Sequence, residues 1–280
     1  MMKVSTLVLT FNEAANLPRC LGALFWCDDI LVLDSGSTDN TVEIAEKYGA
    51  RVLVRPFDNF ALQRNFALEE GSVRHEWVLH LDADEVVTDA FVKHLAALEP
   101  PAGIDGYRIP SKTMFGEKWL RWSGMYPTYQ VRLGRRNKLR FIQVGHGQRE
   151  TLATENLGTF GEPYLHYSFS HGLGRWFEKH STYAAAEARE LALTRAGSKF
   201  RWRDFLHRDK TVRRRATKSL SYHLPLYFRP FARFFYVYFW RRGFLDGAAG
   251  FTYACMLSIY EGMIAVLGSS SNRDLDRDLL

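Results

Sequence analysis

Two aspartates separated by one alanine are the sharpest chemical signal in the chain. Asp82 and Asp84, in Leu81-Asp82-Ala83-Asp84-Glu85, directly follow an apolar run that is typical of a buried strand. Carboxylate oxygens are the ligands that Mg²⁺ and Mn²⁺ prefer, usually with substrate phosphates completing the shell. The pair therefore predicts metal-assisted chemistry with a phosphate leaving group. The alternative is a turn that caps a helix, because Thr88-Asp89 begins another helix soon after.

A second polar turn follows another apolar run. Its sequence is Asp34-Ser35-Gly36-Ser37-Thr38-Asp39. Short acceptor side chains can bind the edges of a nucleobase or a ribose, and the N-terminus of the helix behind them favours phosphate. A capped strand-to-helix turn without a ligand is the alternative. Neither a G-x-G-x-x-G motif after a strand nor a Walker A motif is present in the sequence.

The elements that must position these turns alternate between strand and helix. Strands are predicted over Val4 to Thr10, Ile30 to Leu33, Val52 to Val54 and Trp77 to Leu81. Helices are predicted through Leu17, Leu21 and Leu24, over Thr41 to Tyr48 and over Ala61 to Glu69. This order implies a mainly parallel sheet covered on both faces. In such sheets ligands bind at the carboxyl ends of the strands, where both turns and the segment Thr10 to Glu13 lie.

The later part of the chain has a different pattern. Short strands are predicted at Tyr107 to Ile109 and Gln130 to Leu133, between loops rich in Gly and aromatic residues. Beyond His171 the pattern is helical, through Tyr183 to Ala196. We therefore predict three parts, which are residues 1–100 and 101–170 for the two halves of a sheet domain and 171–280 for a helical extension.

Composition excludes several classes of protein. The 280 residues are 46% hydrophobic and 24% charged, which excludes disorder and low complexity. The three cysteines support neither a disulfide framework nor a structural zinc site. The N-terminus shows no secretory signal. The apolar run Gly247 to Tyr260 has 14 residues, below the ~20 that a spanning helix requires, so no transmembrane anchor is expected.

Charge and aromatic residues are concentrated near the C-terminus. Residues 195–218 contain ten Lys or Arg and two Asp, a charge of +8 within a total of +6. In Ser219 to Tyr260, 14 of 42 residues are aromatic. Together they predict peripheral membrane contact through aromatic rings and anionic headgroups. A solvated helix face is the alternative for the basic block, and core packing or a dimer interface for Phe234, Phe235, Tyr238 and Phe239.

Four motifs carry a resemblance to a known family when they are taken in order. They are Leu7-Val8-Leu9-Thr10-Phe11-Asn12-Glu13, the Asp34 to Asp39 turn, Gln63-Arg64-Asn65 and Leu81 to Glu85. The combination resembles family 2 glycosyltransferases with the GT-A fold. It is similar, more narrowly, to the bacterial lipopolysaccharide core β-glycosyltransferase branch, whose later motifs resemble Val131-Arg132-Leu133, His166 and Arg242-Gly243-Phe244-Leu245-Asp246-Gly247.

This resemblance implies an α/β, Rossmann-like GT-A fold with a C-terminal helical extension, in which residues 1–100 are the nucleotide-sugar-binding half and residues 101–170 the acceptor-binding half. It implies inverting sugar transfer from a nucleoside diphosphate sugar, expected to be a UDP-sugar, to a glycolipid or other lipid-linked saccharide. By this resemblance, Thr10, Asn12 and Glu13 line the pocket for the nucleobase and ribose, and Asp34 hydrogen-bonds the uracil-like edge. Arg64 contacts the nucleotide or its phosphates, and Asp82 contacts the ribose or the donor sugar. Asp84 binds a divalent metal, Mg²⁺ or Mn²⁺. His166 is a candidate for a metal or diphosphate contact, with a structural histidine as the alternative.

Inverting transfer also needs a carboxylate base. The resemblance points to Glu150, although three residues separate it from His146 where the two are adjacent in that branch. A surface acid beside Arg149 is the alternative.

Other classes of function remain open at this point. A non-catalytic nucleotide-sugar or glycan-binding subunit shares the pocket but not the base, and a nucleotidyltransferase also uses metal-binding carboxylates. Nucleic-acid binding is not expected, because no RNA-binding signature accompanies the basic block. The expected location is cytoplasmic, peripheral on the inner face of the cytoplasmic membrane.

Overall fold

The computed structural model describes residues 2–144, 147–197 and 225–269. It divides into two compact units. A sheet unit contains Met1–Arg121 and Met125–His171, and a helical unit contains Trp122–Gly124 and Gly172–Leu280. His146 and residues 198–224, which include most of the basic block, lie outside the described part of the chain.

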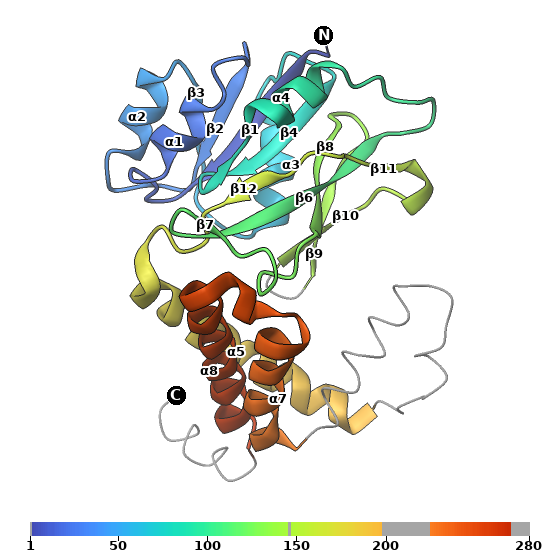
Figure 1. Cartoon of the computed structure of the whole chain (residues 1–280). Helices are drawn as coiled ribbons and strands as arrows, with labels where there is room; N and C mark the ends of the chain where they lie inside the picture. Colours follow the sequence, from blue (N-terminus) through green and yellow to red (C-terminus); the bar gives the residue numbers. More distant parts are fainter. Residues whose placement is uncertain (1, 145–146, 198–224, 270–280) are drawn as a thin grey trace. The chain divides into compact units, whose positions relative to one another are not determined.

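Four parallel strands form the first half of the sheet unit (Figure 1). They are β1 (Val4–Thr10), β2 (Ile30–Asp34), β3 (Arg51–Val54) and β4 (Trp77–Asp82), in the order β3-β2-β1-β4. They are connected by α1 (Leu17–Gly22), α2 (Thr41–Lys47) and α3 (Phe60–Glu70). The predicted strands and helices of this half are confirmed, with ends displaced by one or two residues.

Alternation along the strands explains the two layers of helices. Val8 and Val32 face one side of the sheet, where they belong to a core that includes Leu21 of α1. Leu7 and Leu31 face the other side, where their core includes α3 residues. Because both faces are apolar, the strands are buried on both sides, as parallel sheets require.

The second half of the sheet is mixed. Past β4 the order continues through β8 (Thr128–Arg135), β6 (Gly106–Phe115), β12 (Tyr164–His166) and β5 (Glu85–Val86). β7 (Lys118–Trp119) and β11 (Leu157–Thr159) pair with β6, α4 spans Asp89–Ala96 and η1 spans Thr154–Asn156. A separate hairpin joins β9 (Phe141–Val144) to β10 (Gly147–Glu150). The α/β class with a mostly parallel sheet is confirmed.

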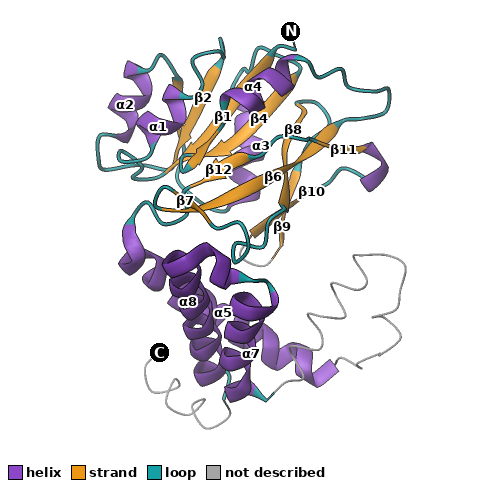
Figure 2. Ribbon diagram, in the orientation of Figure 1, coloured by secondary structure: helices purple, strands orange, loops and turns teal. Residues whose placement is uncertain are grey.

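The helical unit confirms the predicted C-terminal extension. It contains α5 (Gly172–Gly197), η3 (Leu226–Phe228), α7 (Arg229–Phe235), a π-helical turn η4 (Tyr236–Trp240), η5 (Gly243–Asp246) and α8 (Gly247–Leu267). Figure 2 shows α5, α7 and α8 as its main helices. Ala184, Ala188 and Leu191 of α5 share an apolar core with Ile264 of α8.

The motif Arg242 to Gly247 has a structural role in this unit. The Asp246 carboxylate accepts hydrogen bonds from the backbone N–H groups of Trp122 and Ser123, at 3.1 and 2.8 Å, and from the Ser123 hydroxyl at 2.7 Å. Gly247 has φ +64°, a conformation that favours glycine. The motif therefore binds residues 122–124 to the start of α8.

Helix α8 is longer than the apolar run indicated. The run ends before Glu261, but the helix continues to Leu267, and Glu261 pairs with Arg229 at 2.7 Å. The segment Gly243–Leu267 is long and apolar enough, by length and composition, to cross a membrane. Its most apolar 18-residue stretch has a mean hydropathy of 1.4, and 33% of that stretch is buried. A core helix of a soluble protein meets the same test. Run length was therefore the wrong reason to exclude a spanning helix.

The aromatic residues of the helical unit divide into two groups. Phe234 and Tyr238 pack against Phe251, with ring centroids 5.9 and 5.5 Å away, as core packing predicts. Phe235 and Phe239, by contrast, are 64% and 48% exposed. Core packing therefore accounts for some of these rings and leaves others on the surface.

Candidate active site

The carboxyl ends of β1, β2 and β4 meet at one edge of the sheet. Thr10 is in register with Asp34, and Leu9 is in register with Asp82. The Thr10 hydroxyl donates to Asp34 Oδ2 at 2.8 Å. The fold therefore brings Thr10, Asp34 and Asp82 to neighbouring positions, as predicted for parallel strands.

Asp34 organises the turn that follows β2. Its Oδ1 accepts hydrogen bonds from the N–H groups of Gly36 and Ser37, at 2.9 and 2.7 Å. Gly36 has φ +90°, which explains the glycine at this position. At the end of the turn, Asp39 accepts the N–H of Thr41 at 3.0 Å. These are the hydrogen bonds of a capped turn, and contact of Asp34 with a nucleobase stays a prediction.

Asn12 joins the loops after β1 and β2. Its Oδ1 accepts the N–H of Thr38 at 2.8 Å, and its own N–H donates to the Ser37 hydroxyl at 2.7 Å. Asn12 has φ +55°, a left-handed conformation that asparagine tolerates better than most residues. The two loops therefore form one connected surface at the sheet edge.

Glu13 is held on the same side by two polar neighbours. Its Oε2 accepts from Asn16 Nδ2 at 2.6 Å and lies 2.9 Å from His171 Nε2. Burial raises the pKa of Glu13 above its ordinary value, although both hydrogen bonds oppose the rise. The predicted contact of Glu13 with a ribose is not tested by this arrangement.

Asp82 lies between two buried arginines. Arg64 Nη2 is 2.6 Å from Asp82 Oδ1, and Arg132 Nη2 is 2.7 Å from Oδ2. Arg132 also pairs with Glu85, whose Oε2 accepts the backbone N–H of Asp82 at 3.0 Å. The arginines are 1% and 3% exposed and Glu85 is fully buried, whereas the Asp82 side chain remains 35% exposed. The two carboxylates and two guanidiniums balance in charge.

The surroundings shift the pKa values of these acids in opposite directions. Burial alone raises the pKa of Asp82, but Arg132 and Arg64 outweigh it and hold that pKa well below its usual range. Burial raises the pKa of Glu85, and Arg132 only partly offsets it. Asp82 is therefore the more firmly ionised of the two.

Three consecutive side chains of α3 each support a different part of the site. Gln63 Nε2 donates to the backbone carbonyl of Pro56 at 3.1 Å, which fixes the loop after β3. Arg64 holds Asp82. Asn65 donates to the carbonyl and accepts from the N–H of Phe141, both at 2.9 Å, which fixes β9. Their different directions around the helix let one short motif position three loops.

Asp84 and His166 lie together beyond Asp82. His166 is in register with Glu85 on β5, and its Nε2 is 3.3 Å from Asp84 Oδ2. Burial alone lowers the pKa of His166, but Asp84 and the other nearby carboxylates raise it to about 9.

The alternative in which Asp82 and Asp84 cap the next helix is wrong, because the Thr88 side chain caps α4.

A divalent metal fits this corner. Asp84 and His166 offer an oxygen and a nitrogen with side chains 24% and 28% exposed. Among the described residues no three or more His, Cys, Asp or Glu form a complete metal cage. One or two protein ligands with phosphate oxygens completing the shell is the usual arrangement for Mg²⁺. The imidazolium of His166 must lose its proton to become a ligand, and otherwise suits a diphosphate contact.

Glu150 ends β10, opposite Phe141 at the base of the hairpin. Two residues earlier, Gln148 can accept from Arg64 Nε at 2.7 Å and donate to the carbonyl of Phe60 at 3.1 Å. In the described part of the chain no hydrogen bond or ion pair joins Glu150 to Asp82, Asp84 or His166. The hairpin is thus attached to α3 near Asp82, and the role of Glu150 as base stays a prediction.

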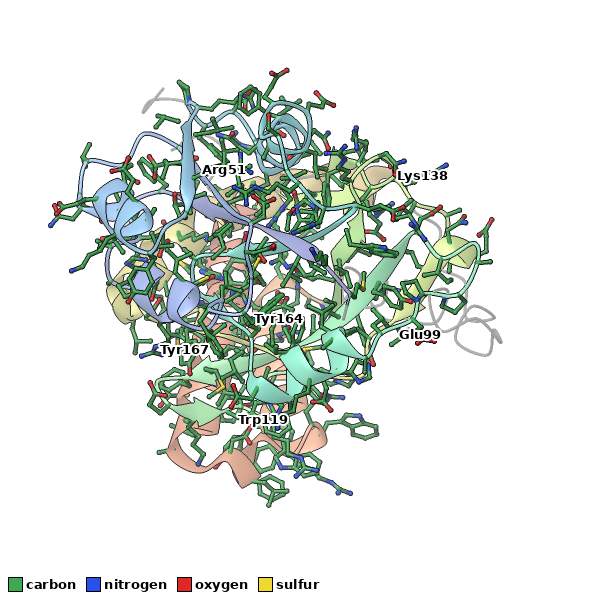
Figure 3. The ribbon with its side chains drawn as sticks, turned by 90° about the horizontal axis from the view of Figure 1, so that it is seen from above. Arg51, Glu99, Trp119, Lys138, Tyr164 and Tyr167 are labelled. Atoms are coloured by element: carbon green, nitrogen blue, oxygen red, sulfur yellow. The ribbon has the colours of Figure 1, made fainter. Side chains whose placement is uncertain are left out.

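Sequence reasoning assigned no role to two charged residues of the cluster. Arg132 and Glu85 stood inside motifs, but their contacts were not foreseen. The signal was available, because an arginine between Val131 and Leu133 places a charge within an apolar strand, and buried charges require partners. The centroid of the Tyr164 ring lies 5.9 Å from the Arg132 guanidinium. In Figure 3, Tyr164 lies among the strands, whereas Glu99 and Lys138 lie near the edge of the view.

Comparison with known proteins decides the family. The model of glycosyl transferase family 2 matches residues 5–153, which contain the sheet edge and its acids. The chain belongs to this family. The resemblance that the four motifs carry is therefore confirmed at the level of the family.

Relatives match parts of the chain. An uncharacterized glycosyltransferase of Rickettsia felis is 42% identical over 86 residues, 30% of each protein. Lipopolysaccharide core biosynthesis glycosyltransferase LpsC of Rhizobium meliloti is 31% identical over 153 residues, 52% of this chain and 53% of that protein. The chain thus matches less than a third of the length of the first and about half of the second.

One solved structure that the chain resembles carries a donor. It is glucosyl-3-phosphoglycerate synthase from Mycobacterium tuberculosis, in complex with Mn²⁺, UDP-glucose and phosphoglyceric acid. The TM-score is 0.39 and the identity 22%, covering 52% of this chain and 61% of that one.

Proposed function

We propose that this family 2 glycosyltransferase moves a sugar from a nucleoside diphosphate sugar, a UDP-sugar in the first instance, to a hydroxyl of a glycolipid resembling the lipopolysaccharide core, with inversion. The observation that carries the proposal is the meeting of the Asp34 turn, Asp82 and the Asp84–His166 pair at one edge of the sheet. The relative LpsC supports the class of acceptor.

In this mechanism the loops after β1 and β2 bind the nucleoside. Asp82, which is ionised and partly exposed, accepts a hydrogen bond from a ribose or sugar hydroxyl. The acceptor oxygen attacks the anomeric carbon while the bond from that carbon to the diphosphate breaks. The Glu150 carboxylate takes the proton from the acceptor hydroxyl, and the nucleoside diphosphate leaves.

Asp84, with His166 beside it, would hold the divalent metal. A metal bound there would supply positive charge to neutralise the diphosphate leaving group without proton transfer.

A thermal-shift titration with UDP and Mn²⁺ tests the site. The wild-type melting temperature should rise with both ligands present, because ligands that bind only the folded state stabilise it. Asp84→Asn should lose most of the Mn²⁺-dependent part of the rise. The matched control is Asp89→Asn, which changes a nearby acid in the first turn of α4. An Asp84→Asn protein that gains as much as the wild type would contradict the metal assignment.

A screen of UDP-, GDP- and dTDP-sugars, with release of the nucleoside diphosphate as readout, tests the reaction. Glu150→Gln should bind UDP as the wild type does and lose turnover. If Glu150→Gln turns over normally, the base lies elsewhere. A wild type that binds UDP but releases no product with any donor and glycolipid acceptor would favour a nucleotide-sugar-binding subunit.

We further propose that the helical unit contacts the inner face of the cytoplasmic membrane. Support comes from an aromatic stripe that runs from the end of η3 along α7 and η4, whose members are 48% to 81% exposed: Phe228, Phe231, Phe235, Phe239 and Trp240. The first four follow at spacings of three and four residues, so they share one helix face. Arg241 and Arg242 follow directly, and aromatic and basic residues together suit an anionic bilayer surface.

Vesicle co-sedimentation tests this contact. Wild-type protein should bind vesicles of phosphatidylcholine and phosphatidylglycerol, and a Phe231→Ser/Phe235→Ser/Trp240→Ser variant should not. Phe25→Ser, which removes an 82% exposed ring of the sheet unit, is the control. Carbonate extraction of cell membranes should release the protein. Retention after carbonate would instead indicate that α8 spans the bilayer.

A further inference from the structure

A β-bulge places Arg132 in the candidate site. On β8, Leu133 pairs with Tyr107 of β6 and Val131 pairs with Arg108, so Arg132 is an extra residue between two pairs. Such a bulge redirects a side chain and is common beside active sites. It explains why Val131 and Leu133, which a regular strand would place on the same face, belong to two different apolar cores.

The redirected guanidinium closes a ring of interactions around the turn after β4. Its Nη2 binds Asp82 Oδ2 at 2.7 Å and also pairs with Glu85. Glu85 in turn accepts the backbone N–H of Asp82 at 3.0 Å. Side chain and backbone of Asp82 are therefore fixed by one connected set of contacts. Asp84 lies in the same turn, between Asp82 and Glu85 in the sequence, and contacts His166.

Arg64 cannot replace this function. Of the two acids it binds only Asp82, through Oδ1, and it approaches from α3. With Arg64 alone, the carboxylate would keep one partner and could rotate about its χ angles, and Glu85 would remain buried without a cation. Arg132 is thus the one described cation that contacts both Asp82 and Glu85.

We infer that Arg132 is a positioning residue for donor use, which orients Asp82 toward the nucleotide sugar and, through Glu85, sets the turn that carries Asp84. This inference rests on the proposed function. Arg132 does not itself contact the reacting atoms in this scheme, and its effect passes through the two acids. An arginine suits this work because one of its terminal nitrogens, Nη2, carries two N–H groups and donates to both carboxylates.

The test compares Glu85→Gln with Glu85→Gln/Arg132→Met. Arg132→Met alone leaves Glu85 buried and unpaired, which can unfold the protein. Glutamine removes that charge and keeps an oxygen for the N–H of Asp82. The double variant should therefore melt near the temperature of Glu85→Gln. Its kcat/KM for the donor should nevertheless be lower by about 10- to 100-fold, the usual loss when a supporting residue is removed.

Two further variants sharpen the result. Glu85→Gln/Arg132→Lys keeps the charge but replaces the planar guanidinium by a compact ammonium on a flexible stem, and should recover only part of the loss. Arg135→Met removes another β8 arginine, which pairs with Glu76 and Asp105, and should leave kcat/KM unchanged.

The possible failures are distinguishable. Wild-type protein that does not bind UDP with Mn²⁺ would overturn the proposed function and this inference together. UDP binding and turnover by the wild type, with equal kcat/KM for Glu85→Gln and the double variant, would overturn the inference alone. Equal losses in Arg135→Met would also overturn it, because the effect would then be general to β8.

Discussion

His80 should make the stability of the protein depend on pH in a predictable way. It lies on β4, fully buried, two residues before Asp82. Neither ring nitrogen has a hydrogen-bond partner within the described residues, and the ring meets Phe141 edge-on at 5.2 Å. Burial, together with the charges of Arg64 and Arg132, holds the pKa of His80 well below its ordinary value.

The sign and size of the effect follow from proton linkage. Above about pH 6.5 the ring is neutral in both the folded and the unfolded chain, so it contributes no pH dependence. Below that pH the unfolded chain binds a proton that the folded chain does not, and the free energy of unfolding falls. The slope is about 1.4 kcal/mol per pH unit, which makes about 2 kcal/mol between pH 6.5 and 5.0.

Urea unfolding of the wild type and His80→Leu at pH 7.5, 6.5, 5.5 and 5.0 measures this effect. Leucine has a similar volume and no titrating group. The difference in unfolding free energy between the two proteins should be constant above pH 6.5 and then move by about 2 kcal/mol in favour of His80→Leu at pH 5.0. His94→Leu, which removes an exposed histidine, is the matched control for the loss of an imidazole. Parallel curves for wild type and His80→Leu would refute the reasoning, since the buried ring would then be protonated in the folded state.

Other substitutions test packing, capping and loop support, the first three by chemical or thermal unfolding and the last by the donor assay. Gly250→Ala should destabilise the helical unit by about 1 to 3 kcal/mol, because the added Cβ would lie 2.1 Å from the carbonyl oxygen of Gly243. Gly174→Ala is its counterpart: nothing lies within 4 Å of the added Cβ, so α5 should gain up to about 1 kcal/mol. Thr88→Ala should lower stability by about 1 kcal/mol through loss of the α4 cap. Asn65→Leu removes both hydrogen bonds to β9, and should lower turnover in the donor assay more than it lowers UDP affinity if the hairpin carries the base.

The sequence predicted the first half of the sheet unit well. Alternating apolar and β-branched runs with short polar turns are local signals, and they placed β1, β2 and β4 within one residue. The same signals placed Asp34 and Asp82 at strand ends, where parallel pairing then brings them together. Local patterning is sufficient where each strand is followed by its own helix.

The remaining features depend on pairing between distant segments. The bulge at Arg132 arises from the register of β8 against β6, which periodicity within β8 does not contain. The contact between His166 and Asp84 depends on β12 pairing with β5, about 80 residues earlier in the chain. The apolar run Gly247 to Tyr260 stops short of the end of α8 because Glu261 interrupts it, although Arg229 neutralises that acid inside the unit. Motif resemblance found His166 and Arg132, but not that they pair with Asp84 and Asp82.

The excursion of residues 122–124 into the helical unit has a consequence for dissecting the protein. Because the polypeptide passes between the two units at Arg121, at Gly124 and again at His171, no single cut separates them cleanly. A fragment that stops at His171 would retain Trp122 and Ser123 while losing Asp246, which accepts their N–H groups. If the sheet unit were expressed alone, residues 122–124, between β7 and β8, would lose the carboxylate that accepts their hydrogen bonds. Functional studies should therefore use the intact polypeptide.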